Sequence, residues 1–245
     1  EEQERRRAEE ERLIAEAEEA ERVRQEEELA QWDELLHSPD TPLEVLIPML
    51  VALMASDDDD SVVAAVMRLA LCVDQSEDAE QMAVLGTVLR DNCGLEALLS
   101  ILRNPELAEE VHQSALLVLG NLGSDTVDAH AELTRQRLKS YDGFAQLLAH
   151  VRSSSQTTTI YALGAVQNIC SIDPEFAAEC RGEHPILDWL TELTQSDDDR
   201  IQHYAHGCLQ NIDRTNQREE IARAAREAAA NETAASAGGA PIETH

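Results

Sequence analysis

The chain has 245 residues and a formal net charge of −30, from 19 basic and 49 acidic side chains. With Lys139 as its only lysine, it lacks the clustered cations that bind phosphate groups, which argues against nucleic acid or a membrane as its partner. Aromatic residues make up 3 % of the chain, and Ala, Leu and Glu dominate, which favours an all-α fold.

Residues 1–32 are predicted to form a charged helical arm. Glu precedes Arg by four positions in the pairs Glu1–Arg5 and Glu18–Arg22, an order that stabilises a helix. The apolar stripe along the arm is thin and rich in alanine, and it is too short to predict a coiled coil. The arm is therefore either a helix surrounded by solvent or a strut that packs on a helix of a partner.

Residues 42–213 are predicted to form a repeat domain that begins with a capped helix. Thr41 stands at the N-cap, Pro42 at the first helical position and Glu44 three residues after the cap, the order of a capping box. An apolar pattern with the spacing i, i+3, i+4, i+7, typical of a helix with one buried face, then occurs four times. Its copies are Leu43-Leu46-Ile47-Leu50, Leu95-Leu98-Leu99-Leu102, Phe144-Leu147-Leu148-Val151 and Ile186-Trp189-Leu190-Leu193.

A second apolar pattern, with offsets 0, 1, 4 and 7, follows each copy of the first and always starts with alanine. The two patterns recur together every 42 to 52 residues, a period typical of stacked helical repeats. The segments 79–91, 125–140 and 174–181 leave room for one further helix between successive pattern pairs, so we expect three helices per repeat. The copies are Ala65-Val66-Leu69-Cys72, Ala115-Leu116-Leu119-Leu122, Ala162-Leu163-Val166-Ile169 and Ala205-His206-Leu209-Ile212.

Two further segments are predicted after the repeats. Residues 214–230 are expected to form a C-terminal helix rich in Ala and Arg. Residues 231–245, which contain the run Ala-Ser-Ala-Gly-Gly-Ala-Pro, are expected to be a disordered tail. Because the chain opens on Glu1, we also expect it to be a fragment of a longer protein.

Three segments with the same residue order identify the repeat. Residues 117–122 are Leu-Val-Leu-Gly-Asn-Leu, residues 164–169 are Gly-Ala-Val-Gln-Asn-Ile, and residues 207–212 are Gly-Cys-Leu-Gln-Asn-Ile. They resemble the third helix of the armadillo repeat, Trp-Ala-Leu-x-Asn-Ile/Leu, and residues 93–99, Cys-Gly-Leu-Glu-Ala-Leu-Leu, resemble its second helix. The resemblance covers residues 42–213 and implies a right-handed α-solenoid of about four repeats that binds proteins.

The sequence departs from the armadillo pattern at the positions that bind peptides in the nuclear-import receptors of this family. There, Trp and Asn residues clamp an extended basic peptide. The Asn position holds Leu71 in the first repeat and Asn in the other three. This departure argues against a receptor for nuclear-localisation signals. The Trp positions hold Met67, Leu117, Gly164 and Gly207.

The third helices also carry the candidate partner-binding residues. Positions four and seven residues before each Asn share its face, so Tyr161 and Tyr204 occupy equivalent places. We interpret this face as a ladder whose amides bond the backbone of an extended partner while the rings pack on its side chains. The alternative is that the amides bond neighbouring turns and the rings fill space between repeats. The candidate residues are Ser114, Leu117, Asn121, Tyr161, Gly164, Gln167, Asn168, His203, Tyr204, Gly207, Gln210 and Asn211.

The sequence shows no motif for catalysis, a cofactor or a metal. It has no glycine-rich phosphate loop and no Gly-x-Ser-x-Gly nucleophile motif. His203, His206 and Cys208 are close in the chain, but they do not converge as zinc ligands must. The acidic runs 57–60 and 197–199 lack the Gly and Glu of a calcium loop, and we interpret them as helix N-termini.

The five cysteines form no Cys-x-x-Cys pair, and their odd number and apolar neighbours indicate reduced, buried thiols. No apolar run is long enough to span a bilayer and no signal-peptide pattern is present, so we expect a cytoplasmic or nuclear protein. The basic run of Arg135, Arg137 and Lys139 is interpreted as a solvated helix face. The cysteines are Cys72, Cys93, Cys170, Cys180 and Cys208.

These observations favour a non-enzymatic interaction module, a scaffold or adaptor, that binds a protein through the solenoid groove or the N-terminal arm. The acidity of the chain fits a basic or extended partner segment, and we expect the protein to work within a larger complex. Two alternatives stay open. One is a co-chaperone similar to the armadillo-type nucleotide exchange factors of Hsp70, and the other is a structural subunit of a large assembly.

Overall fold

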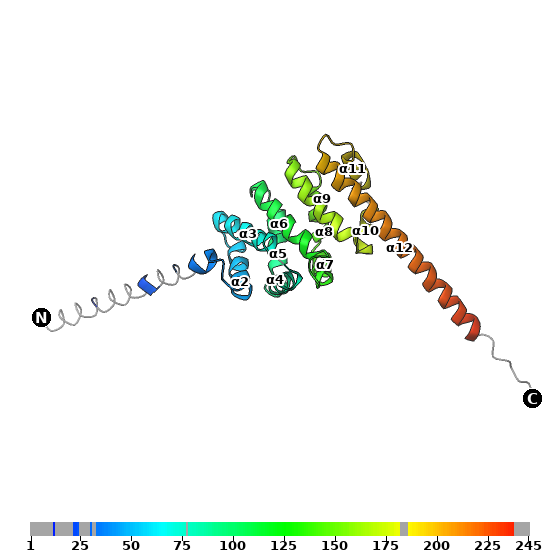
Figure 1. Cartoon of the computed structure of the whole chain (residues 1–245), viewed down its shortest axis with the longest axis horizontal. Helices are drawn as coiled ribbons and strands as arrows, with labels where there is room; N and C mark the ends of the chain where they lie inside the picture. The colour runs from blue at the N-terminus through cyan, green and yellow to red at the C-terminus, as the bar shows by residue number, and fades with distance from the viewer. Residues whose placement is uncertain are drawn as a thin grey trace, which may run out of the picture.

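The computed structural model of the chain describes residues 33–76, 78–181 and 186–237, together with residues 12, 22–24 and 30. The described residues form helices joined by short connections and contain no strand. The helices follow one another in one stack, with α2 toward one end and α12 toward the other (Figure 1). The predicted all-α solenoid is confirmed. The charged arm lies mostly outside the described residues and stays a prediction.

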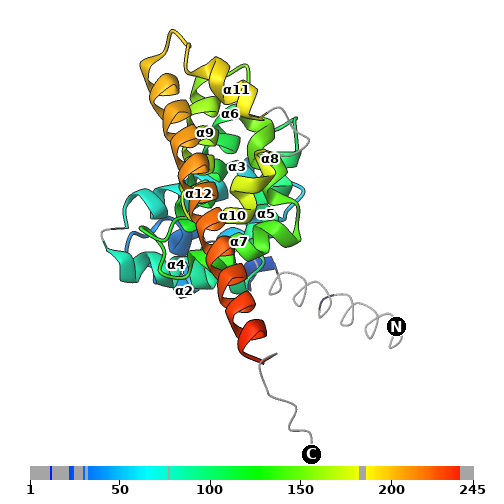
Figure 2. The same cartoon turned by 90° about the vertical axis from the view of Figure 1, so that its right-hand side faces the viewer.

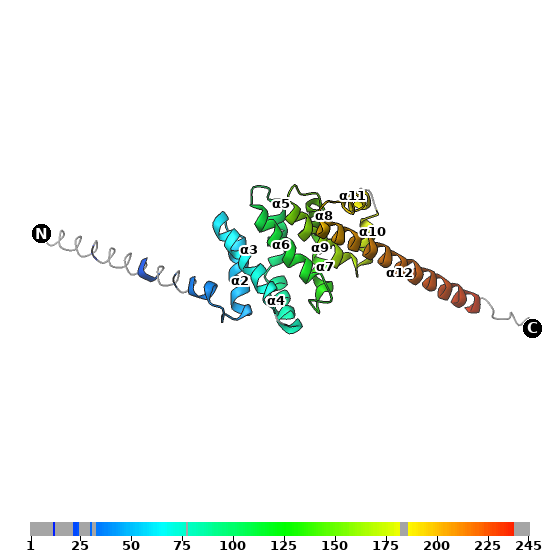
Figure 3. The same cartoon turned by 45° about the horizontal axis from the view of Figure 1, so that its top comes forward.

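From α4 onward the helices fall into the expected groups of three, and α2 and α3 precede these groups. The groups are α4 to α6, α7 to α9 and α10 to α12. The third helices α3, α6, α9 and α12 lie side by side in this order (Figures 1 and 3). The bounds are α2 Leu43–Met54, α3 Asp59–Asp74, α4 Ala79–Asp91, α5 Gly94–Arg103, α6 Glu109–Leu122, α7 Ala131–Ser140, α8 Gly143–His150, α9 Gln156–Cys170, α10 Pro174–Glu179, α11 Ile186–Leu193 and α12 Asp199–Ala237.

Small residues let successive third helices pack closely. A Cβ atom added to Gly120 of α6 would lie 2.8 Å from the Cα atom of Ala165 on α9, so the two backbones are in near contact. The alanine that starts each copy of the second pattern is at most 1 % exposed, which confirms the predicted register of the third helices. These alanines are Ala65, Ala115, Ala162 and Ala205.

The two acidic runs lie at helix starts, as interpreted. Ahead of α3, the Asp58 carboxylate accepts a hydrogen bond from the backbone N–H of Ser61 at 3.0 Å. Ahead of α12, the Asp198 carboxylate accepts from the side chain of Arg200 at 2.8 Å and from its backbone N–H at 2.8 Å. These bonds lower the pKa of Asp198 to about 2, because they favour its charged form.

The capping box expected at Thr41 is not formed. The Thr41 hydroxyl donates to the carbonyl of Leu35 at 2.7 Å instead, and α2 begins at Leu43 without a side-chain cap. Pro42 takes the N-cap position, with an extended backbone at φ −58° and ψ 142°. The prediction was wrong because the Thr41 hydroxyl bonds the preceding helical turn at Leu35 and does not cap α2.

Helix α12 is longer than the sequence analysis predicted. It runs without a break through residue 213, where the repeat domain was expected to end, and through the separate helix expected at 214–230. Residues 231–237 of the expected tail are helical too, whereas residues 238–245 lie outside the described part. No Gly or Pro stands between Gly207 and Gly238, so nothing local ends the helix. The second half of α12 projects beyond the stack (Figures 1 and 2).

Three of the five cysteines are buried thiols, as predicted. Cys170 and Cys180 approach to 3.8 Å between their sulfur atoms, and burial also raises the pKa of Cys208. Cys72 is half-buried, and burial raises its pKa. Cys93 differs from the prediction. It is exposed, and it has a left-handed backbone (φ 60°) directly before α5.

No helix in the described part of the chain is both long and apolar enough to cross a bilayer.

Candidate partner-binding groove

A hollow of about 430 Å³ lies between the third helices α6, α9 and α12. Six of the candidate residues line it, so the structure brings together side chains that the sequence placed on three separate repeats. We call this hollow, together with the equivalent face of α3 beside α6, the third-helix groove. The candidate residues that line the hollow are Leu117, Asn121, Tyr161, Gly164, Asn168 and Tyr204.

The other six candidate residues lie on the same helices but outside the lining of this hollow. Ser114 is one turn before Leu117, and its hydroxyl donates to the carbonyl of Glu110 at 2.9 Å. Gln167 is half-buried between α9 and α12. The remaining four belong to α12, the last third helix, beyond which no further repeat is described. They are His203, Gly207, Gln210 and Asn211.

Six lining residues were missed by the sequence analysis. Thr157 and Arg200 stand eleven residues before Asn168 and Asn211, respectively, which places each on the same helix face as its asparagine. This spacing could have identified them. Ile160 does not have this spacing from an asparagine, so the sequence pattern could not identify it. Leu116, Gly120 and Ala165 are buried contacts between α6 and α9 that form the floor of the hollow.

The asparagines of the third helices, Asn121, Asn168 and Asn211, each donate a hydrogen bond from the amide nitrogen to a backbone carbonyl of the protein. Asn168 Nδ2 donates to the carbonyl of Gly120 at 3.2 Å, and Asn211 Nδ2 donates to the carbonyl of Gln167 at 3.0 Å, each reaching the preceding third helix. Asn121 Nδ2 bonds a carbonyl of its own helix at 2.8 Å. The amides therefore have the packing role that was the alternative interpretation. Each amide has a second N–H and an acceptor oxygen, so these bonds do not use up its capacity for a partner.

The two glycines at Trp positions have different surroundings. A Cβ atom at Gly164 would meet only the ring of Tyr204, at 3.8 Å, so the space in front of this residue is open. A Cβ atom at Gly207 would lie 2.4 Å from the amide nitrogen of Gln167. Gly164 therefore leaves an open recess where armadillo repeats carry a Trp side chain, whereas at Gly207 the Gln167 side chain fills this space.

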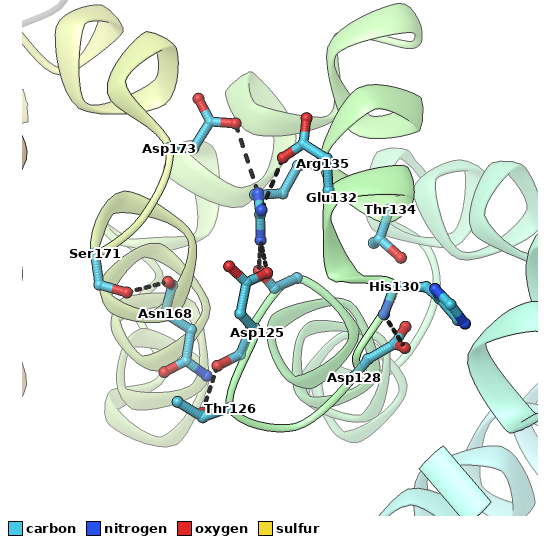
Figure 4. Close-up of polar contacts among 12 residues, drawn as sticks. Asp125, Thr126, Asp128, His130, Glu132, Thr134, Arg135, Asn168, Ser171 and Asp173 are labelled. Carbon is cyan, nitrogen blue, oxygen red and sulfur yellow. Dashed lines mark hydrogen bonds and ion pairs between the residues drawn. The ribbon is translucent and has the colours of Figure 1, made fainter. Parts of the chain in front are cut away.

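A buried ionic network lies near the C-terminal end of α9 (Figure 4). Arg135 of α7 is 3 % exposed and donates to Asp125 and Glu132, both at 2.8 Å. Its Nε atom lies 3.6 Å from Asp173, the cap of α10. Burial lowers the pKa of Arg135, but the hydrogen bonds that Arg135 donates to Asp125 and Glu132 outweigh burial and raise the pKa. Arg135 thus connects the chain before α7 with the chain after α9.

The rest of the basic run is paired as well. Lys139 Nζ lies 2.9 Å from Asp173 and 2.8 Å from Glu175, and Arg137 lies 2.9 Å from Glu96 of α5. The interpretation as a solvated helix face was wrong for Arg135, because acidic residues of neighbouring elements converge on it. The run is a structural connection between repeats.

A second, larger hollow of about 510 Å³ opens between the ends of α2, α3 and α4. Arg68 lines it and donates to the carbonyl of Ser38 at 3.2 Å. Its lining is not repeated on successive helices, and none of the candidate residues lies there. The third-helix groove is therefore the better candidate for the functional site.

No family model matches the chain, and no curated protein matches it. Solved structures do match: an engineered protein is 21 % identical with a TM-score of 0.58, over 73 % of this chain and 68 % of that one. A designed armadillo repeat protein in complex with the peptide (KR)4 is 20 % identical with a TM-score of 0.55, over 68 % of this chain and 64 % of that one.

A third structure, a computationally designed armadillo repeat protein for modular peptide recognition, is 20 % identical with a TM-score of 0.55. This chain matches slightly less than two thirds of the length of both designed armadillo proteins, 64 % in each case. At these identities the likeness concerns the fold. The stacked three-helix groups, the third helices side by side and these structural neighbours together show that the chain has an armadillo-like repeat fold.

Proposed function

We propose that this chain is a non-enzymatic interaction module that holds an extended segment of a protein partner in the third-helix groove. The observation that carries the proposal is the recess at Gly164, which Tyr161, Tyr204 and Asn168 surround on two adjacent third helices. Aromatic rings beside amide groups suit a peptide, because rings pack on side chains while amides bond a backbone. The designed neighbours support a groove of this fold as a peptide site.

The proposal includes a cellular setting. We expect the protein to act as a scaffold or adaptor within a larger complex, in the cytoplasm or the nucleus. The projecting half of α12 is exposed from Gln217 to Asn231 and is available for a second contact within such a complex.

Gly164→Trp is expected to abolish partner binding while the protein stays folded. The new side chain would enter the open recess and occupy the space of the partner, whereas its Cβ atom meets only the Tyr204 ring. The probe is a peptide of about 12 residues selected from a random display library on the unaltered protein. We expect its dissociation constant to rise by at least about tenfold, measured by calorimetry.

The matched control is Ala178→Trp, which adds the same side chain at an exposed site on α10. It should leave the affinity unchanged. If Gly164→Trp folds, as judged by circular dichroism, and still binds the selected peptide with full affinity, then the binding site lies elsewhere, on another face of the solenoid or on the arm at residues 1–32.

A further inference from the structure

The third-helix groove changes in character along the stack. On α9 and α12 its outer face carries tyrosines, asparagines and glycines. On α3 the equivalent positions carry the apolar side chains Met67 and Leu71, and on α6 they carry Leu117 beside Asn121. We call Met67, Leu71 and Leu117 the apolar strip. The strip continues the groove beyond the hollow, because α3 packs directly beside α6.

The apolar strip is unusually open to water. Met67 is 51 % exposed and Leu71 is 41 % exposed, although both are large apolar side chains on one helix face. Leu117, which stands at the equivalent position of α6, is half-buried and also lines the hollow. Neighbouring exposed apolar side chains indicate a contact surface, since covering them removes apolar area from water.

Acidic side chains lie at one edge of the strip. Asp60 and Glu110 are exposed and stand seven residues before Met67 and Leu117, which places each on the same face about 10 Å along its helix. Among the described residues, Arg68 is the only Arg or Lys on α3 and α6, and its guanidinium turns away to a backbone carbonyl at 3.2 Å. This end of the groove therefore combines an apolar surface with exposed acidic side chains.

Resting on the proposed function, we infer that the α3–α6 end of the groove binds a segment in which apolar residues alternate with Lys or Arg. In an extended chain, successive side chains point to opposite sides, so an apolar side chain can cover the strip while its neighbour reaches toward an acid. Charge complementarity of this kind selects among partners and speeds association. Neighbouring helix axes are about 8–10 Å apart, so the axes of the first and last third helix are about 24–30 Å apart. An extended segment of about 12 residues is about 40 Å long and therefore reaches across all four helices.

The test uses three labelled peptides of about 12 residues and equal length, with alternating Leu-Lys, alternating Ser-Lys and alternating Leu-Glu sequences. By fluorescence anisotropy, we expect the Leu-Lys peptide to bind at least about tenfold more tightly than either of the others. Equal affinity of the Ser-Lys peptide would show attraction by charge alone and would overturn the inference, as would no binding of the Leu-Lys peptide.

Variants of the protein then locate the contact. Met67→Ser together with Leu71→Ser should weaken the Leu-Lys peptide by about tenfold. The matched control is Val45→Ser together with Leu133→Ser, which removes two equally exposed apolar side chains of α2 and α7 and should leave the affinity unchanged.

The contribution of the acidic side chains Asp60 and Glu110 is tested with a second pair of double variants. Asp60→Asn with Glu110→Gln should weaken the peptide by several-fold, whereas Asp59→Asn with Glu80→Gln should not. All four residues are in the first turn of a helix, so both double variants lose the same charge and the same dipole interaction.

If Gly164→Trp removes binding but the groove variants at α3 and α6 do not, the inference is wrong and the proposed function stands. If Gly164→Trp has no effect on any bound peptide, the proposed function itself fails.

Discussion

Asp128→Ala is expected to destabilise the protein by about 3–5 kcal/mol, as breaking a buried ion pair does. Asp128 is fully buried and lies 2.5 Å from Arg90 of α4, whose side chain is 6 % exposed. The same carboxylate accepts from the backbone N–H of His130 at 2.8 Å. Among the described residues, the substitution would leave the Arg90 cation in the interior with the hydroxyls of Thr134 and Thr87 as its hydrogen-bond partners. Urea unfolding followed by circular dichroism measures the loss.

Two further variants test whether the stability lost in Asp128→Ala comes from the unpaired, buried charge of Arg90 rather than from substitution in general. Arg137→Ala breaks a partly exposed pair with Glu96 and should cost no more than about 1 kcal/mol. Arg90→Met combined with Asp128→Leu removes both buried charges and should recover much of the stability lost in Asp128→Ala. A loss in Asp128→Ala as small as that in Arg137→Ala would mean that water reaches the Arg90 site.

Gly120→Ala is expected to destabilise the protein by about 2–3 kcal/mol, although alanine is the better helix former by about 1 kcal/mol. The added Cβ atom would lie 2.8 Å from the Cα atom and 2.9 Å from the Cβ atom of Ala165. Both atoms belong to the α9 backbone or sit directly on it, so α6 and α9 must move apart to accept the methyl group.

Gly164→Ala provides the matched control, because the same substitution is made inside the next third helix. There the new Cβ atom has open space apart from the Tyr204 ring at 3.8 Å, so the helix propensity of alanine should leave stability unchanged or raise it by up to about 1 kcal/mol. Chemical unfolding of both variants gives the difference. Equal stability of the two would show that α6 and α9 are not in close contact at Gly120.

Much of the fold was predictable from the sequence because the repeats impose the same packing on equivalent positions. A residue between two third helices must be small, so alanine at 65, 115, 162 and 205 revealed the register of all four helices. The end of α12 was not predictable in this way. Beyond residue 213 no repeat pattern applies, and a helix without Gly or Pro continues until its local sequence stops it.

The groove was predictable in part for the same reason. Tyr161 and Tyr204 recur at the same distance from an asparagine, so periodicity alone placed them on one face. The partners of the asparagine amides could not be predicted, since they depend on the separation of neighbouring helices. The burial of Arg135 could not be predicted either. In the sequence, Arg135 and Glu132 have the spacing of an exposed ion pair on one helix, and only the fold brings Asp173 of another repeat close to Arg135.

The most direct test of the proposed groove uses the three tyrosines of the chain. Tyr161 and Tyr204 line the hollow, whereas Tyr141 is 42 % exposed on the turn between α7 and α8 and serves as an internal control. With 13C-labelled tyrosine rings, the selected peptide is titrated and the ring signals are followed by NMR. A partner in the groove should shift the signals of Tyr161 and Tyr204 and leave Tyr141 in place. Saturated binding that moves only Tyr141, or no tyrosine, would contradict the proposal.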